Sequence, residues 1–103
     1  MDIEEIRRKV RAGKYTISFT HTEKLRWRRI RAQDIETAIE SGIIVEEYPS
    51  DPRGASCLVL GFVRERPLHT VYARLEAEEI LIVTAYEPDQ GEWVDDWKTR
   101  KVR

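Results

Sequence analysis

The stretch PLHTVYARLEAEEILIVTAYEP, residues 67–88, decides the fold of this chain. Two strand-like runs, 67–75 and 80–88, flank a short charged break, which predicts an antiparallel hairpin at the centre of a sheet. The second run is nearly all apolar and rich in β-branched residues, as expected of a strand covered on both faces. Both runs also carry polar groups that a core strand does not need: His69, Tyr72 and Arg74 on the first, and Tyr86 and Glu87 closing the second. The centre of the sheet is therefore where we look first for function.

Outward from this hairpin, apolar periodicity predicts further strands over 15–19, 43–48 and 56–63. Helices are predicted over 2–13, 21–29 and 33–41, and a short terminal helix over 89–101, where Trp93 and Trp97 at i, i+4 would dock one face on the body. Gly61, inside a strand, suggests a bulge or a close approach of another backbone. Strands that follow one another through short turns imply an α+β domain: an antiparallel sheet of four to five strands with helices on one face.

Length and charge limit the possible classes of protein. The 103 residues allow one domain, spanning 1–103, with a single core. The net charge of −1 hides an asymmetry, since residues 1–31 carry ten Lys and Arg against four Asp and Glu, whereas 33–51 carry six acids and no base. One basic and one acidic side fit a protein that meets phosphate on one surface and another partner elsewhere. A solvated surface of mixed charge explains the same composition.

Other classes are disfavoured. Cys57 is the only cysteine, so neither an internal disulfide nor a Cys-rich zinc site can form. No phosphate loop, dinucleotide glycine motif or metal-ligand pattern is present, and we expect neither a metal nor a cofactor. No apolar run approaches the roughly 20 residues that span a membrane, and the first residues are too charged for a signal peptide. We therefore expect a cytoplasmic protein that does not enter a membrane.

The predicted helix over 21–29 is unusually basic. His21, Lys24 and Arg28 recur at i, i+3, i+7 and so share one stripe, with Arg29 beside it. Cations on such a stripe can bind the backbone of a polyanion without reading its sequence. Trp27 lies among these bases and could stack a nucleobase. The alternative is a solvated basic helix in which Trp27 packs against the body.

These residue types suit cleavage of RNA without a metal. That reaction needs a base for the ribose 2′-hydroxyl proton, cations for the developing phosphorane charge and an acid for the leaving oxygen. A His near neutral pKa can be base or acid, and Lys and Arg supply the charge. His69 shares a strand face with Val71 and Ala73, where a hydrogen-bonded core histidine is the alternative to a catalyst. For Tyr86 and Glu87, the alternative to a functional role is that they simply end the strand.

Four motifs together resemble a prokaryotic family of uncharacterised small domains: HTEKLRWRRI over 21–30, YPSD over 48–51, RPLH over 66–69 and TAYEPDQGEW over 84–93. The resemblance covers nearly the whole chain, roughly Ser18 to Lys101, and the last motif is a specific signature. This family looks like a relative of the RelE and BrnT toxins of type II toxin–antitoxin systems. Its members often sit beside a small zinc-finger antitoxin of the kind that partners the MqsR toxin.

The resemblance implies a RelE-like α+β fold, cleavage of free or ribosome-bound mRNA, and a cognate antitoxin, with a zinc-finger protein among the candidates. Residues of this chain that match the family's motifs are His21, Lys24, Leu25, Arg28, Ile30, His69 and the run from Tyr86 to Asp89. Where relatives have Gly-Ile-Ser before the third helix, this chain has Arg29-Ile30-Arg31, which loses a turn glycine and a Ser cap and adds positive charge.

Two hypotheses follow from different classes. The first is a toxin that acts as a metal-independent mRNA endoribonuclease. In this hypothesis His21 and His69 are the acid–base candidates, and Tyr86 orients the substrate or donates a proton. The substrate-binding groups are Lys24, Arg28, Trp27 and Arg29. The second is a non-catalytic module that binds nucleic acid or protein with the same fold. RelE-like folds also host DNA-gyrase inhibitors, so a gyrase-poisoning toxin is a third hypothesis.

Overall fold

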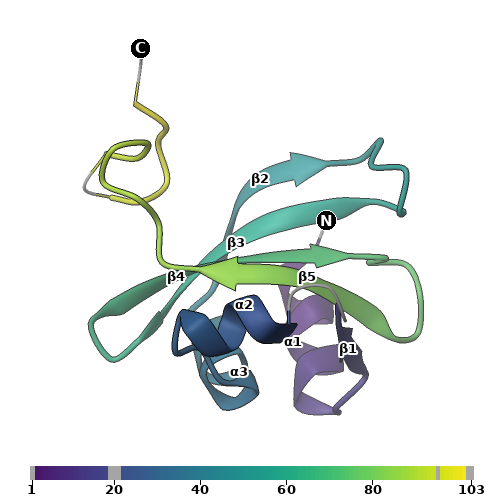
Figure 1. Ribbon diagram of the computed structural model, residues 1–103. Helices are drawn as coiled ribbons and strands as arrows, with labels where there is room; N and C mark the ends of the chain where they lie inside the picture. The colour runs from purple at the N-terminus through teal and green to yellow at the C-terminus, as the bar shows by residue number, and fades with distance from the viewer. Residues whose placement is uncertain (1, 19–21, 95, 102–103) are drawn as a thin grey trace.

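The computed structural model describes residues 2–18, 22–94 and 96–101, and its Cα radius of gyration is 12.9 Å. Its elements in chain order are α1 Ile3–Arg11, β1 Tyr15–Ile17, α2 Thr22–Trp27, α3 Ala32–Glu40, β2 Ile43–Tyr48, β3 Ser56–Val63, β4 Arg66–Ala73 and β5 Ile80–Tyr86 (Figure 1). Every predicted element up to residue 86 therefore has the predicted type, although α1, β1 and α2 are shorter than predicted. The predicted first residue of the basic helix, His21, lies outside the described residues.

The five strands form one mixed sheet in the order β1-β5-β4-β3-β2. The predicted hairpin is present, with His69 opposite Tyr86 in an antiparallel register, and the pairs β2–β3, β3–β4 and β4–β5 are all antiparallel. The prediction of a wholly antiparallel sheet is wrong for β1, which runs parallel to β5 and pairs Tyr15 with Ile80. A parallel pair needs a long crossover, and here the whole chain from α2 to β4 supplies it.

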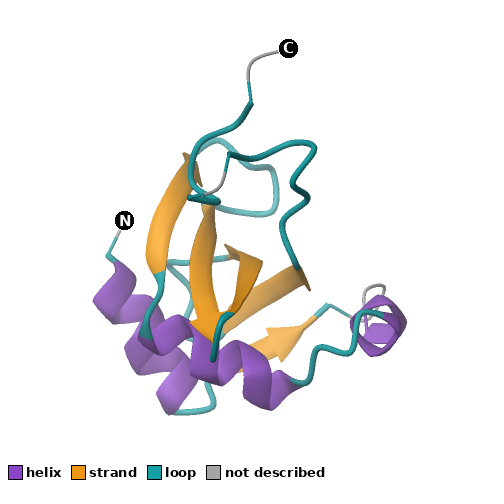
Figure 2. Ribbon diagram, turned by 90° about the vertical axis from the view of Figure 1, so that its left-hand side faces the viewer, coloured by secondary structure: helices purple, strands orange, loops and turns teal. Residues whose placement is uncertain are grey.

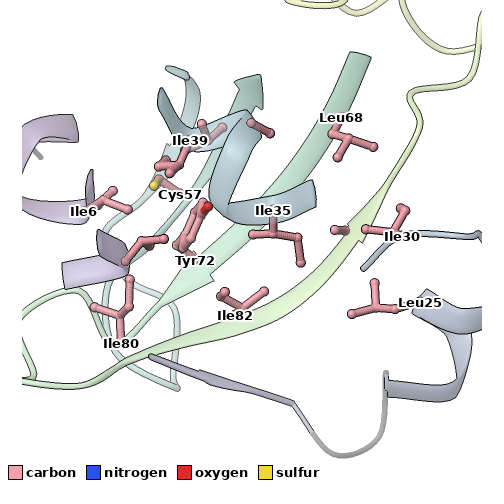
Figure 3. Close-up of a cluster of buried hydrophobic side chains, with 14 residues drawn as sticks. Ile6, Leu25, Ile30, Ile35, Ile39, Cys57, Leu68, Tyr72, Ile80 and Ile82 are labelled. Carbon is pink, nitrogen blue, oxygen red and sulfur yellow. The ribbon is translucent and has the colours of Figure 1, made fainter. Parts of the chain in front are cut away.

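The helices pack on one face of the sheet and enclose the main core (Figure 3). Ile35 and Ile39 of α3 and Tyr72 and Ile82 of the hairpin are each at most 1% exposed. Burying an aliphatic or aromatic side chain of this size contributes about 1.5–3 kcal/mol, so this layer dominates the stability of the domain. Alternation along β4 sends His69 to the other face, away from the helices.

Gly61 was predicted to mark either a bulge or the close approach of another backbone, and the structure confirms the close approach. A Cβ built on Gly61 would lie 2.0 Å from the Ala38 carbonyl oxygen, so α3 can pack this tightly only over a glycine. The end of α3 is held from α1, because the Arg7 guanidinium donates to the carbonyls of Ile39 at 2.9 Å and Gly42 at 2.6 Å. These bonds add to the Gly42 N–H, which donates to the same Ile39 carbonyl at 3.0 Å, in capping the end of α3.

The longest helices in the described part of the chain, α1 and α3, have nine residues each. Since about 20 apolar residues are needed to span a bilayer, no described helix has the length or apolarity to cross a membrane.

The predicted terminal helix is wrong. Residues 89–94 and 96–101, named here the C-terminal strap, form an irregular loop closed by Val94 N to Thr99 O at 2.9 Å and Lys101 N to Glu92 O at 2.8 Å. The Asp96 carboxylate accepts from the backbone N–H groups of Lys98 and Thr99, a local bond that competes with helix formation. The strap lies on the side of the sheet opposite the helices, as both ribbon views show (Figure 1, Figure 2).

Candidate functional site

The candidate site is built at the sheet edge where β1 ends. β1 and the residue after it follow β5 only as far as Ile82, whose carbonyl accepts from Ser18 N at 2.8 Å. Beyond that point Arg28, just after α2, occupies the edge: Nη1 donates to Thr84 Oγ1 at 3.0 Å and to the Ala85 carbonyl at 2.9 Å. Arg28 therefore anchors α2, which stands apart from the other helices in Figure 2, to the strand that carries Tyr86.

Tyr86 connects this edge to the centre of the sheet. Its ring centroid lies 5.9 Å from the Arg28 guanidinium carbon, within the range of a cation–π contact. On its other side the ring meets His69 edge-on, with the centroids 5.6 Å apart. Tyr86 is half-buried, and this burial raises the pKa of its phenol. The hydroxyl therefore keeps its proton near neutral pH, as a proton donor must.

His69 is enclosed on the sheet face opposite the helices. Its ring is 0% exposed and meets Trp93 edge-on at 4.5 Å between centroids. Nε2 donates to the Trp97 carbonyl at 2.7 Å, because a carbonyl can only accept, and this assigns the proton to Nε2. Nδ1 is buried and has no hydrogen-bond partner among the described residues. Burial lowers the pKa of His69, so the imidazole stays neutral at pH 7.

A second arginine, Arg66, belongs to the same site. Arg66 donates to the carbonyls of Arg29 at 3.0 Å and Arg28 at 2.7 Å, and its Nε is hydrogen bonded to the Glu87 carboxylate. A cation at this position pairs the last carbonyls of the α2 turn, where the helix dipole is negative. Arg28, Arg66, Tyr86 and Glu87 together line an open pocket of about 270 Å³. Its wall thus carries two guanidiniums, one phenol and one carboxylate.

Arg66 and Glu87 are absent from the sequence-predicted site. Both lie inside the motifs quoted above, but neither belongs to the basic stripe of His21, Lys24 and Arg28. The signal that could have revealed them is the register of the hairpin: His69 opposite Tyr86 brings residues 66–69 beside 86–89. The register alone does not show that Arg66 also reaches α2, because that contact depends on how the helix packs.

The structure brings Arg28, Tyr86 and His69 into one chain of contacts, with only the first two on an open surface. Lys24 is exposed one turn before Arg28, whose backbone N–H donates to the Lys24 carbonyl at 3.0 Å. Trp27 is 87% exposed, so it does not pack against the body. Arg29 is also exposed, but it lines two other hollows and not the pocket at Arg28.

In the described part of the chain, no group of three or more His, Cys, Asp or Glu side chains is arranged to hold a metal ion. Cys57 is buried in β3, and burial raises its thiol pKa to about 12. The thiol is therefore protonated at neutral pH and inert as a nucleophile.

The fold and the site define a small α+β domain with a basic helix at one edge of a mixed sheet. The chain belongs to the family described as domain of unknown function (DUF4258), whose model matches residues 21–87. Comparison with curated proteins and with solved structures gives no match. The matched range begins just before α2 and ends at Glu87, so it contains the pocket residues and leaves out α1, β1 and the C-terminal strap.

Proposed function

We propose that this domain is the toxin of a type II toxin–antitoxin system and cleaves mRNA without a metal ion, on a RelE-like fold. One observation carries the proposal: the open pocket lined by Arg28, Arg66, Tyr86 and Glu87 beside the exposed basic turn of α2. Two guanidiniums can hold a phosphate, and a carboxylate and a phenol supply a base and an acid. The resemblance to toxin families supports the same reaction class.

The pocket residues suggest a division of roles. Glu87 takes the proton of the ribose 2′-hydroxyl as the 2′-oxygen bonds to phosphorus, and Arg28 and Arg66 stabilise the added negative charge. The bond from phosphorus to the 5′-oxygen then breaks, and the Tyr86 hydroxyl donates its proton to that oxygen. The products are a 2′,3′-cyclic phosphate and a 5′-hydroxyl end. The phosphate replaces Glu87 on Arg66, which frees the carboxylate to act as the base.

Residues outside the pocket contribute binding and positioning. Lys24 extends the phosphate-binding surface along α2, and the exposed ring of Trp27 offers a face on which a base can stack. His69 is enclosed in the sheet, so in this proposal it is a positioning residue that holds the Tyr86 ring by edge-on packing. His21 keeps its predicted acid–base role as a hypothesis, and it lies outside the described residues.

A second candidate function is a non-catalytic module that binds RNA or protein through α2. The observation that favours it is the enclosure of His69, whose Nε2 is bonded to the Trp97 carbonyl and whose ring is 0% exposed. Because the His69 imidazole is not accessible, Tyr86 and Glu87 would have to act as the acid and the base of the pocket. If these two groups do not act, the same cations would still bind a polyanion.

The test combines growth, RNA integrity and purified protein. Induced expression of the wild-type chain should arrest growth with fragmented mRNA, and Tyr86→Phe, which removes only a hydroxyl, should relieve both effects. Lys98→Ala, an exposed cation in the strap, is the matched control and should remain toxic. Purified wild-type protein should cut RNA in the presence of EDTA and leave cyclic-phosphate ends. RNA that is bound but stays intact would identify the binding module instead.

A further inference from the structure

A second hollow lies beside α2 and shares no lining residue with the pocket of Arg28, Arg66, Tyr86 and Glu87. Its volume is about 520 Å³, and it opens where β1, α2 and the start of α3 meet. Its floor is apolar and comes from three elements and the turn between them: Ile17, Leu25, Ile30 and Ala32. Its rim carries three guanidiniums, from Arg26, Arg29 and Arg31. We call this hollow the arginine-rimmed groove.

The local backbone creates this division into floor and rim. Ile30 N donates to the Leu25 carbonyl at 2.9 Å and Arg29 N to the Arg26 carbonyl at 3.0 Å, which closes α2 tightly. Arg29 has φ 56°, a left-handed conformation that is uncommon for a residue with a side chain. The turn directs Ile30 inward, where it is 4% exposed beside Leu25 (Figure 3), and leaves Arg29 in solvent.

The rim is strongly positive. None of the residues that line the groove within the described ranges carries a carboxylate. Asp34 pairs with Arg31 at 3.2 Å and offsets part of the charge, so Arg26 and Arg29 contribute most of the positive potential. A ligand with negative charge would be attracted to this rim and a cationic one repelled.

The apolar floor favours an acidic peptide over a nucleic acid as the ligand of the groove. Nucleic acid contacts proteins through phosphates, base edges and flat base faces, and none of the described residues that line this hollow is aromatic. An aliphatic side chain of a peptide fits such a floor, and arginines around an apolar centre are typical of protein interfaces. The composition of the groove therefore matches a peptide with acidic residues on either side of an apolar anchor.

We propose that the arginine-rimmed groove docks an acidic segment of a partner protein, which inserts Leu, Ile or Phe side chains over Leu25 and Ile30 and pairs its carboxylates with Arg26 and Arg29. The groove is distinct from the pocket of Arg28, Arg66, Tyr86 and Glu87. The inference therefore stands whether or not the domain cleaves RNA, and it adds a second surface to α2.

The probe is a displayed library of random peptides of about twelve residues, selected on the whole chain and then measured singly by fluorescence anisotropy. We expect the selected peptides to be enriched in Asp and Glu around one or two apolar residues. Two variants block the groove differently: Ala32→Phe fills the exposed first position of α3, and Arg26→Glu reverses charge at the rim. Each should weaken binding by about tenfold or more, and Lys98→Glu, the matched charge change in the strap, should not.

Three results would overturn the proposal: no enriched acidic and apolar pattern, selected peptides that bind both groove variants as well as wild type, or selected peptides that a short uridine-rich RNA displaces completely. The last result would make the groove part of a general polyanion surface. Because Tyr86→Phe removes only a hydroxyl of the pocket and keeps the Arg28 bonds that anchor α2, it should abolish or reduce RNA cleavage and leave peptide binding unchanged. Failure of the nuclease proposal would thus be visible separately from failure of the docking proposal.

Discussion

Nε2 of His69 lies 2.7 Å from the carbonyl oxygen of Trp97, so the C-terminal strap is hydrogen bonded to the centre of the sheet. Trp93 of the strap is 2% exposed and covers the same imidazole, and Arg100 extends the contact by pairing with Glu46 at 2.7 Å while stacking 4.6 Å from the Trp93 centroid. The strap thus completes the second face of the sheet. His69 and the Glu46–Arg100 pair join the sheet to the strap.

His69→Ala should therefore lower the free energy of unfolding by about 2–4 kcal/mol, because it leaves a cavity beside Trp93 and an unpaired Trp97 carbonyl. Urea unfolding followed by tryptophan fluorescence measures the loss. His69→Gln retains an N–H donor and should recover part of it. A loss below about 1 kcal/mol for His69→Ala would contradict a structural role for this ring.

The stability of the domain should fall as the pH falls through the range in which His69 titrates. Burial lowers the pKa of His69 in the folded state, so between its ordinary value of about 6.5 and that lower value the unfolded chain binds more protons. The contribution is complete above about pH 6.5 and is lost on acidification, at no more than about 1.4 kcal/mol per pH unit. Urea unfolding at pH 7.5 and at pH 5.5, values about one unit either side of that pKa, measures it.

The control for this pH effect removes the imidazole itself. His69→Gln should flatten the dependence above about pH 5, where carboxylates contribute little. An unchanged slope in His69→Gln would mean that other groups cause the acid destabilisation.

Substitutions at Lys24 and Arg28 should affect RNA binding and the free energy of unfolding to different extents. Lys24→Ala should change the free energy of unfolding by less than about 0.5 kcal/mol, since Lys24 is exposed, and should lower the salt slope of RNA binding by about 0.7. Arg28→Ala should also cost about 1–2 kcal/mol of stability, because two hydrogen bonds to the β5 edge are lost. Anisotropy of labelled single-stranded RNA across salt concentrations, beside urea unfolding, measures both. A Lys24→Ala slope equal to wild type would exclude a phosphate contact at that position.

Gly61→Ala should destabilise the domain by about 3 kcal/mol or more, because its methyl group would overlap the Ala38 carbonyl at 2.0 Å and force α3 off the sheet. Gly91→Ala is the control, since its nearest neighbour is the flexible Asp89 side chain at 3.2 Å. Thermal melts of the two variants would make the comparison. Equal small losses would show that α3 shifts without cost.

The local elements follow from the sequence because their causes are local. Ile35, Ala38 and Ile39 recur at helical spacing and are buried in α3, and the β-branched run over 80–86 forms β5. The hairpin could also be predicted, because it depends on residues adjacent in sequence, and the close approach at Gly61 was one of the two roles predicted for a glycine inside a strand. The stripe of Lys24 and Arg28 needed only the helix period.

What the sequence did not determine depends on contacts between distant segments. The strap is not a helix, although Trp93 and Trp97 have helical spacing, because Trp93 packs on His69 and Asp96 binds local N–H groups instead. β1 is parallel to β5 because of the path that α2 and α3 take across the sheet. The enclosure of His69 and the meeting of Arg66 with Glu87 likewise arise only when the strap and α2 dock. Periodicity specifies which face of an element is apolar, but the tertiary structure decides what covers that face, because burial there depends on residues far away in the chain.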